Sequence, residues 1–252
     1  MTTSPDAPVG AVGDPSEADH EHGEHHHRDV QGGAARAAVF GVSDGLVSNV
    51  GLILGVAGAE PAPSIVRLAG LAGLIAGAIS MAAGEYNSMR VQTELLEREL
   101  ELERLEIRRN PELETEELAA LYRSRGMEAE VAREMAETIM SDPEVALETH
   151  AREELGVDPD QLGSPLGAAG SSLVAFSLGA VVPLVPWFFG SGTGAIVASV
   201  VGALLAAVVV GAAIGRFTGR SLARTVGRQI LFTLVPAVLT FAIGSAVGVS
   251  GV

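Results

Sequence analysis

The sequence predicts an all-α, polytopic membrane protein with five transmembrane helices and a helical insert between the second and the third. Its mean hydropathy is positive, at +0.35, and only 4% of its 252 residues are aromatic. A bilayer core of about 30 Å needs roughly 20 apolar residues per helix. Five stretches meet this length, at about residues 34–59, 68–89, 167–189, 193–215 and 229–250. Buried helices of a large soluble protein are the alternative, but these stretches are too long and too poor in charge for it.

Residues 1–33 precede the first apolar stretch and form a tail rich in histidine and acidic residues. The tail has no apolar periodicity, so we expect it to be disordered and cytoplasmic. Its run HEHGEHHH, residues 20–27, could bind metal through imidazole and carboxylate groups, could simply be solvated, or could be an irregular purification tag. No basic segment followed by an apolar one is visible here, so we expect no signal peptide.

The first two apolar stretches, within residues 34–89, contain polar groups that a lipid environment alone does not explain. Asp44 lies in FGVSDGLVSNVGLILGV, and a charged residue in the middle of a membrane helix costs about 2.5–3.5 kcal/mol without a partner. In the second stretch, Met81 and Glu85 lie one turn apart beside a stripe of glycines. The GxxxG spacing, which is typical of close helix packing, occurs at 41–45, 51–55 and 73–77.

Asp44 and Met81 together indicate a pathway for a cation. A hard carboxylate oxygen and a soft thioether sulfur suit a borderline first-row divalent metal better than Mg²⁺ or Ca²⁺. Ordinary packing is the alternative for Met81, and a hydrogen bond between helices is the alternative for Asp44. Glu85 could be solvated near the cytoplasmic boundary. We assign these three residues to a candidate transport pathway and leave the alternatives open.

Residues 90–164 differ from the rest of the chain in composition and form the predicted cytoplasmic insert. From Glu94 to Asp160 there are 21 acidic and 8 basic residues, and the apolar residues recur at helical spacing. Breaks between helices are predicted at Asn110–Pro111, Gly126 and Asp142–Pro143. We expect helices over 90–109, 111–125 and 128–155, the last with an interruption. The first of them could continue the second apolar stretch.

Several carboxylates of the insert repeat at the spacing of one helical turn. Glu99, Glu103 and Glu106 share one face, as do Glu114 and Glu117, and His150 lies one turn before Glu154. Like charges so placed repel each other unless a cation lies between them. Any single glutamate here could be an ordinary solvated charge, but the group as a whole is a candidate metal site.

Residues 165–252 hold the last three apolar stretches, and the loops between them indicate the orientation. The connection RFTGRSLARTVGR carries four arginines, whereas WFFGSGTG carries none. Basic residues favour the cytoplasmic side, so we expect the tail and the insert in the cytoplasm and the C-terminus on the opposite face. Arg67, in the short first outer loop, is the one basic residue that does not fit this orientation.

What the sequence lacks excludes several classes of protein. It contains no cysteine, so it has neither disulfides nor a thiol nucleophile. Its formal net charge of −15 disfavours nucleic acid as a partner and favours cations. It has no phosphate-binding loop with lysine and no paired Glu-x-x-His pattern of a di-iron bundle. We therefore expect that it is not an enzyme and holds no permanent cofactor.

The chain resembles the vacuolar iron transporter family, including its bacterial members, at GVSDGLVSNVGLILGVAGA (41–59), GLAGLIAGAISMAAGEYNS (70–88) and HAREELG (150–156). The resemblance implies a homodimer, in the plasma membrane of a bacterium, that exchanges cytoplasmic Fe²⁺ and often Mn²⁺ for protons. It also implies that Asp44 and Met81 line the pathway at the dimer interface. Glutamates of the insert would gather the metal, and the matching residues are Glu103, Glu106, Glu114, Glu117 and Glu154. Some members have methionine near the last of these, where this chain has His150.

Two functions stay open at this point. The first is a proton-coupled exporter of a divalent metal, in which Asp44, with Glu85 as a second candidate, alternates between metal and proton. The candidate ions are Fe²⁺, Mn²⁺, Zn²⁺ and Co²⁺. The second is a membrane-anchored metal buffer or sensor, in which the insert binds metal and the apolar helices only anchor it. A mere anchor has no use for Asp44, so we favour transport.

Overall fold

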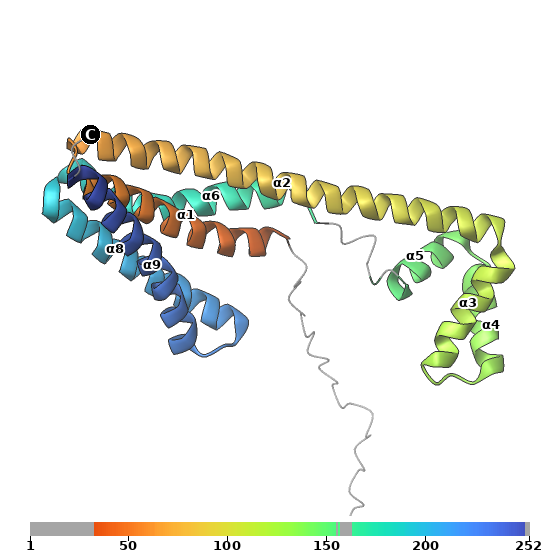
Figure 1. Cartoon of the computed structure of the whole chain (residues 1–252). Coiled ribbons are helices and arrows are strands. Elements are labelled where there is room, and N and C mark those ends of the chain that lie inside the picture. Colours follow the sequence, from red (N-terminus) through yellow and green to blue (C-terminus); the bar gives the residue numbers. More distant parts are fainter. Residues whose placement is uncertain (1–32, 155, 157–162, 250–252) are drawn as a thin grey trace, which may run out of the picture. The chain divides into compact units, whose positions relative to one another are not determined.

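The computed structural model describes residues 33–154, 156 and 163–249, and this part of the chain is helical apart from short connections (Figure 1). The helices are α1 (Gly33–Gly58), α2 (Pro63–Arg109), α3 (Pro111–Ser124), α4 (Ala129–Met140), α5 (Pro143–Glu153), α6 (Pro165–Leu184), α7 (Pro186–Phe189), α8 (Gly192–Thr218) and α9 (Leu222–Val249). The all-α class is therefore confirmed for these residues. The predicted tail, with its histidine run, lies outside the described residues except for Gly33, which begins α1.

Five of the described helices, namely α1, α2, α6, α8 and α9, are long and apolar enough to cross a membrane, judged by length and composition. Apart from α1, which is the most buried of the five, these helices carry their large apolar side chains mostly on the outside. In α9 only 11% of the most apolar window is buried. A helix in the core of a soluble protein would be buried on most of its apolar surface. The exposed apolar faces fit lipid and argue against the soluble alternative.

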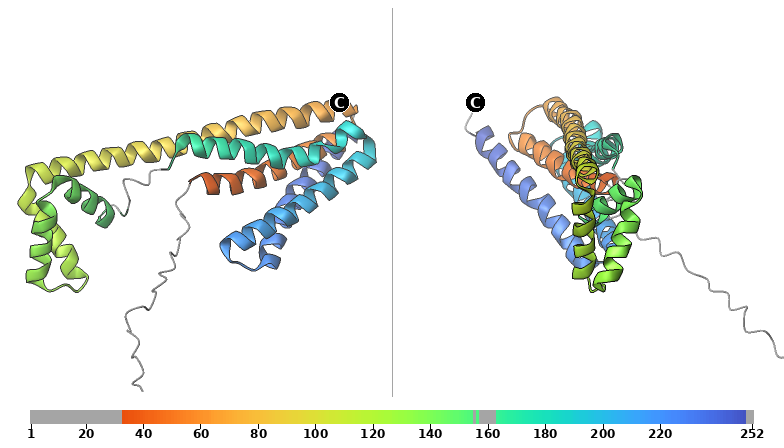
Figure 2. Two further views of the ribbon diagram at one scale, coloured as in Figure 1. Left: turned by 180° about the vertical axis from the view of Figure 1, so that it is seen from behind. Right: turned by 90° about the vertical axis from the view of Figure 1, so that its right-hand side faces the viewer.

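Helix α1 is the central helix of the apolar bundle and packs against α2, α6, α8 and α9 (Figure 2). Glycines allow the backbones to approach closely on two sides. A Cβ on Gly45 would overlap the carbonyl of Phe176 in α6, and one on Gly179 of α6 would overlap the carbonyl of Val42. On the side of α9, a Cβ on Gly244 would overlap the carbonyl of Gly55. Close packing therefore explains these glycines, and for Gly45 and Gly55 it is what the GxxxG spacing predicts.

Polar side chains inside the bundle fasten α1 to its neighbours. Asn49, which is buried, donates from Nδ2 to the carbonyl of Ala180 in α6 at 2.6 Å. Ser43 Oγ donates to Gln229 Oε1 of α9 at 2.9 Å. Because unpaired polar groups are expensive in an apolar environment, these bonds fix the register of α1 against α6 and α9.

Helix α2 is a single helix of 47 residues, which corresponds to a length of about 70 Å at 1.5 Å per residue. Its first part is apolar and its second part is charged. The boundary that composition suggests between residues 89 and 90 therefore falls inside one continuous helix, and the first predicted helix of the insert does continue the second apolar stretch.

The remaining helices of the insert begin and end close to the predicted breaks. Asn110 takes the N-cap position of α3, although its side chain makes no capping hydrogen bond. Gly126, which follows the C-terminal end of α3, has a positive φ of 97°. Asp142 caps α5 by accepting from the backbone N–H groups of Glu144 and Val145. Helices α3 and α4 pack through a small core, formed by Leu118, Ala119, Tyr122, Ala132 and Ala136.

We predict that Gly45→Ala destabilises the protein by on the order of 1–3 kcal/mol, because the new methyl group forces α1 and α6 apart. Gly170→Ala in α6 is the matched control, since a Cβ there meets nothing within 4 Å and alanine favours a helix. Thermal unfolding of both variants in detergent checks this. Equal melting temperatures for the two variants would contradict the close packing of α1 on α6.

Candidate metal site

His150 lies at the centre of a cluster of carboxylates in the insert. Its side chain, on α5, is completely buried. Its Nδ1 lies 3.0 Å from Oε1 of Glu103 on α2, 3.3 Å from Oε1 of Glu154 at the end of α5 and 3.8 Å from Oε2 of Glu114 on α3. Three separate helices therefore contribute to one site.

The turn between α2 and α3 and the cap of α5 explain why these residues meet. The chain changes direction at Asn110, because Pro111 begins a new helix, and the first turn of α3 stays near the last turns of α2 (Figure 1). Ala146 and Ala151, which are both buried, are small enough to let α5 lie against neighbouring helices. His150 and Glu154 are one turn apart and therefore share a face.

The spacing of these atoms suits a single metal ion. Ligand atoms of Glu103, His150 and Glu154 all lie within 4.8 Å of one another. For metal–ligand bonds of about 2.1 Å, neighbouring ligand atoms lie about 3.0 Å apart at octahedral angles and about 3.4 Å apart at the tetrahedral angle. The separations of 3.0 and 3.3 Å fall in this range.

The hydrogen bonding of the cluster also fits a cation. Within the described residues, Oε1 of Glu103 and both ring nitrogens of His150 are buried and lack a well-aligned hydrogen bond. A buried polar atom without a partner carries a free-energy penalty. A bound metal would remove this penalty for Glu103 and for one of the two ring nitrogens.

The electrostatics of the cluster show the cost of holding these carboxylates without a metal. Burial, together with the negative charges of Glu154, Glu106 and Glu117, raises the pKa of Glu103 to about 7. Burial and the charge of Glu103 likewise raise the pKa of Glu114 to about 7, against the opposing effect of His150. Protons therefore compete with metal for this site near neutral pH.

The structure divides the six predicted ligands of the insert into two groups. Glu103, Glu114 and His150 are buried, and Glu154 adjoins them. Glu106 and Glu117 are exposed and act on the buried carboxylates through their charge. Their side chains lie outside the tight cluster and are candidates for a first encounter with a cation.

The three residues predicted in the apolar helices have different surroundings. Asp44 is partly exposed and accepts a hydrogen bond of 2.8 Å from Ser48 Oγ on the same helix. Met81 packs against a small cluster around Phe176. Glu85 is buried and pairs with Arg36 of α1 at 3.0 Å, so the alternative of a solvated Glu85 is wrong.

The structure does not bring these residues together with the insert cluster. In α2, 22 residues separate Met81 from Glu103, which corresponds to about 33 Å along the helix. The pairing of Arg36 with Glu85 is a contact that the sequence did not reveal. The two residues are far apart in the chain, and no periodicity links them.

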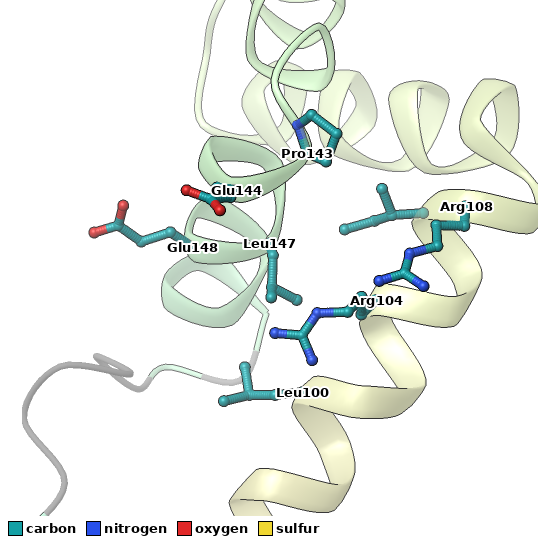
Figure 3. A pocket seen from close by; sticks show the side chains of 8 residues that line it. Leu100, Arg104, Arg108, Pro143, Glu144, Leu147 and Glu148 are labelled. Atoms are coloured by element: carbon teal, nitrogen blue, oxygen red, sulfur yellow. The ribbon is translucent and has the colours of Figure 1, made fainter.

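A cleft of about 490 Å³ between α2 and α5 is distinct from the cluster (Figure 3). Arg104 and Arg108 lie on its α2 wall, and Glu144 and Glu148 lie on its α5 wall, where Leu147 points toward the arginines. It is lined by none of the predicted ligands. Its arginines would repel a cation, so we do not assign the metal to it.

We predict that, without metal, α3 and α5 become less stable as the pH rises from about 4.5 to about 7. The folded state binds more protons than the unfolded state in this range, because the pKa values of Glu103 and Glu114 are raised, so the free energy of unfolding falls with rising pH. Hydrogen exchange of the α3 and α5 amides, corrected for the intrinsic rate and measured with a chelator, checks this. The double variant Glu103→Gln, Glu114→Gln should show a weaker dependence of this stability on pH. An unchanged pH dependence would contradict the prediction.

Comparison with known proteins identifies the family. A model of the VIT family matches residues 35–245. The vacuolar iron transporter of Acanthamoeba castellanii is 39% identical over 153 residues, which cover 61% of this chain and 55% of that protein. Vacuolar iron transporter 2 of Oryza sativa and vacuolar iron transporter 1 of Arabidopsis thaliana are each 34% identical, over 67% of this chain and 68% of their own length. The chain thus spans little more than half of the Acanthamoeba relative. Because the family model covers most of its length, and because it has long apolar helices, the chain belongs to the VIT family and is a multi-pass membrane protein.

Proposed function

We propose that this protein transports divalent metal, Fe²⁺ first and Mn²⁺ as a second ion, out of the cytoplasm in exchange for protons. The observation that carries the proposal is the cluster of Glu103, His150 and Glu154, whose atoms are spaced for one metal ion. Relatives that bear the name vacuolar iron transporter support the choice of iron.

The donor set supports a first-row divalent ion. Two carboxylates and one imidazole combine hard and borderline ligands, which suit Fe²⁺, Mn²⁺, Co²⁺ and Zn²⁺ and disfavour Cu⁺. The ion is cargo in this proposal, so the site has to release it. Competition from protons, which the raised pKa values of Glu103 and Glu114 imply, keeps the binding reversible.

The proposed topology has five spans, α1, α2, α6, α8 and α9, with the insert in the cytoplasm between the second and third. The arginines in and beside the connection from α8 to α9 support this orientation, and they are Arg216, Arg220, Arg224 and Arg228. The N-terminus would lie in the cytoplasm and the C-terminus on the opposite face, in the plasma membrane of a bacterium.

The pathway through the membrane would run beside Asp44 and Met81, at the interface of a homodimer. Asp44 is partly exposed in the single chain, and a second copy could cover it. Its carboxylate can hold a metal ion as the anion and a proton as the acid, so the same group can exchange one for the other. Met81 would add a soft ligand that is selective for transition metals.

A membrane-anchored metal buffer or sensor is the second candidate. The distance of about 33 Å along α2 between Met81 and Glu103 favours it, because the cluster could bind metal without the apolar helices. The two functions differ in their need for Asp44. A buffer binds the same amount of metal without it, whereas a transporter fails.

We predict that Glu103→Gln, Glu114→Gln and Glu154→Gln together abolish most of the stabilisation by Mn²⁺ or Fe²⁺ in the full-length protein in detergent. A ligand at 100 times its dissociation constant stabilises the folded state by about 2.7 kcal/mol, and the triple variant should lose most of this. The matched control replaces three exposed glutamates, Glu97, Glu130 and Glu134, by glutamine. If both triple variants respond to metal equally, the ligands lie elsewhere.

We predict that Asp44→Ala and Asp44→Asn abolish metal uptake into proteoliposomes under an imposed pH gradient, because neither side chain can exchange a proton for a metal ion. Fe²⁺, Mn²⁺, Co²⁺ and Zn²⁺ are compared. Glu60→Gln, which removes a carboxylate from the connection between α1 and α2, is the control and should transport at the wild-type rate. Failure of the wild-type protein to move any ion in either gradient would exclude transport and leave the buffer.

A further inference from the structure

Glu85 is a buried carboxylate whose charge is balanced by a single arginine. Its Oε2 lies 3.0 Å from Nη2 of Arg36, and this is its only ion pair within the described residues. The two side chains differ in exposure, since 62% of the Arg36 side chain and 10% of the Glu85 side chain are accessible. The guanidinium is therefore accessible from outside the chain, whereas the carboxylate is enclosed by it.

The backbone around Arg36 is held in place by other contacts. Ala37 packs in a small cluster with Met89 of α2 and Ala168 of α6. Ser171 Oγ, also from α6, donates to the carbonyl of Ala34 at 3.0 Å. These contacts hold the start of α1 without help from the ion pair, so Arg36 can leave Glu85 without any movement of the backbone.

Glu85 lies along α2 between the two predicted sets of ligands. It follows Met81 by one helical turn, and it precedes Glu103 by 18 residues, or about 27 Å. Arg36 precedes Asp44 by eight residues of α1, or about 12 Å. An ion that moved along α2 from the insert cluster toward Met81 would pass Glu85.

A buried carboxylate needs a compensating cation, and losing its partner is strongly unfavourable. Arg36 supplies that charge when no metal is present, and a divalent cation could supply it instead. The two cannot occupy the same oxygen atoms. Loss of the arginine would therefore leave a stronger cation site, and a site that binds too strongly slows the passage of an ion.

We propose that Arg36 is a resident counter-cation that competes with the transported divalent ion for Glu85 and so keeps binding there weak enough for release. The inference rests on the proposed transport function. Arg36 is a positioning residue in this scheme, because it acts on the ion through Glu85. Its removal should lower both KM and kcat, whereas a purely structural role would lower only the amount of folded protein.

The absence of cysteine allows a test in which only a charge changes. Arg36→Cys is introduced into the full-length protein together with Glu103→Gln and Glu154→Gln, which weaken the insert cluster. The single thiol is then modified with the cationic aminoethyl methanethiosulfonate or with propyl methanethiosulfonate, a neutral reagent of nearly the same size. Mn²⁺ binding is measured in detergent, and Mn²⁺ transport of the corresponding variants with an intact insert is measured in proteoliposomes.

The neutral adduct should bind Mn²⁺ about five-fold more tightly than the cationic adduct, which is the effect of one partly exposed ion pair. Adding Glu85→Gln should abolish the difference. Arg90→Cys is the matched control, because Arg90 pairs with Glu94 and both side chains are exposed. The Mn²⁺ affinities of its two adducts should differ by about two-fold or less. In transport, the neutral adduct should show the lower KM and the lower kcat.

Equal Mn²⁺ affinity of the two adducts would overturn the proposal, and so would a difference that persists with Glu85→Gln. The binding measurement does not require transport. A wild-type protein that moves no ion would therefore refute the proposed function, while the two adducts would still decide whether Arg36 competes for Glu85.

Discussion

Carboxylates held away from water are the constraint on which this molecule depends. Each buried carboxylate requires a proton, a basic side chain or a metal ion nearby, because an uncompensated buried charge is strongly unfavourable. In the insert, the pKa values of Glu103 and Glu114 are raised to about 7, so protons can neutralise these carboxylates, and His150 lies beside both. The bundle meets this requirement with Arg36 beside Glu85. The rest of the fold brings these partners together from separate helices.

Two features of the backbone bring His150 and Arg36 to their carboxylate partners. Helix α2 carries Glu85 and Glu103 on one continuous helix, so their separation is fixed by helical geometry. Helix α1 lies close to α6 because glycines remove side chains where the two backbones meet, as at Gly45 and Gly179. A larger residue there would shift α1 and with it Arg36. The small-residue packing of the bundle and the charge balance of Glu85 are therefore linked.

Much of this could be predicted from the sequence, because much of it is local. Apolar length predicts the long helices, and Pro111 and Gly126 predict breaks that the structure confirms. The spacing of His150 and Glu154 places them on one face of α5. The ion pair of Arg36 and Glu85 could not be predicted, because the two residues are 49 positions apart in the sequence and meet only through the packing of α1 against α2. For the same reason the sequence could not distinguish the buried Glu103 from the exposed Glu106.

The two compensated sites should respond differently to an arriving cation. In the insert the compensating charge is partly a proton, since the pKa values of Glu103 and Glu114 are raised to about 7, so metal binding there releases protons and weakens as the pH falls. At Glu85 the compensating charge is an arginine, which stays protonated at any physiological pH. A cation that takes its place releases a side chain and no proton. The proposed transporter therefore combines a pH-dependent site in the insert with a carboxylate in the bundle whose occupancy depends on competition between cations.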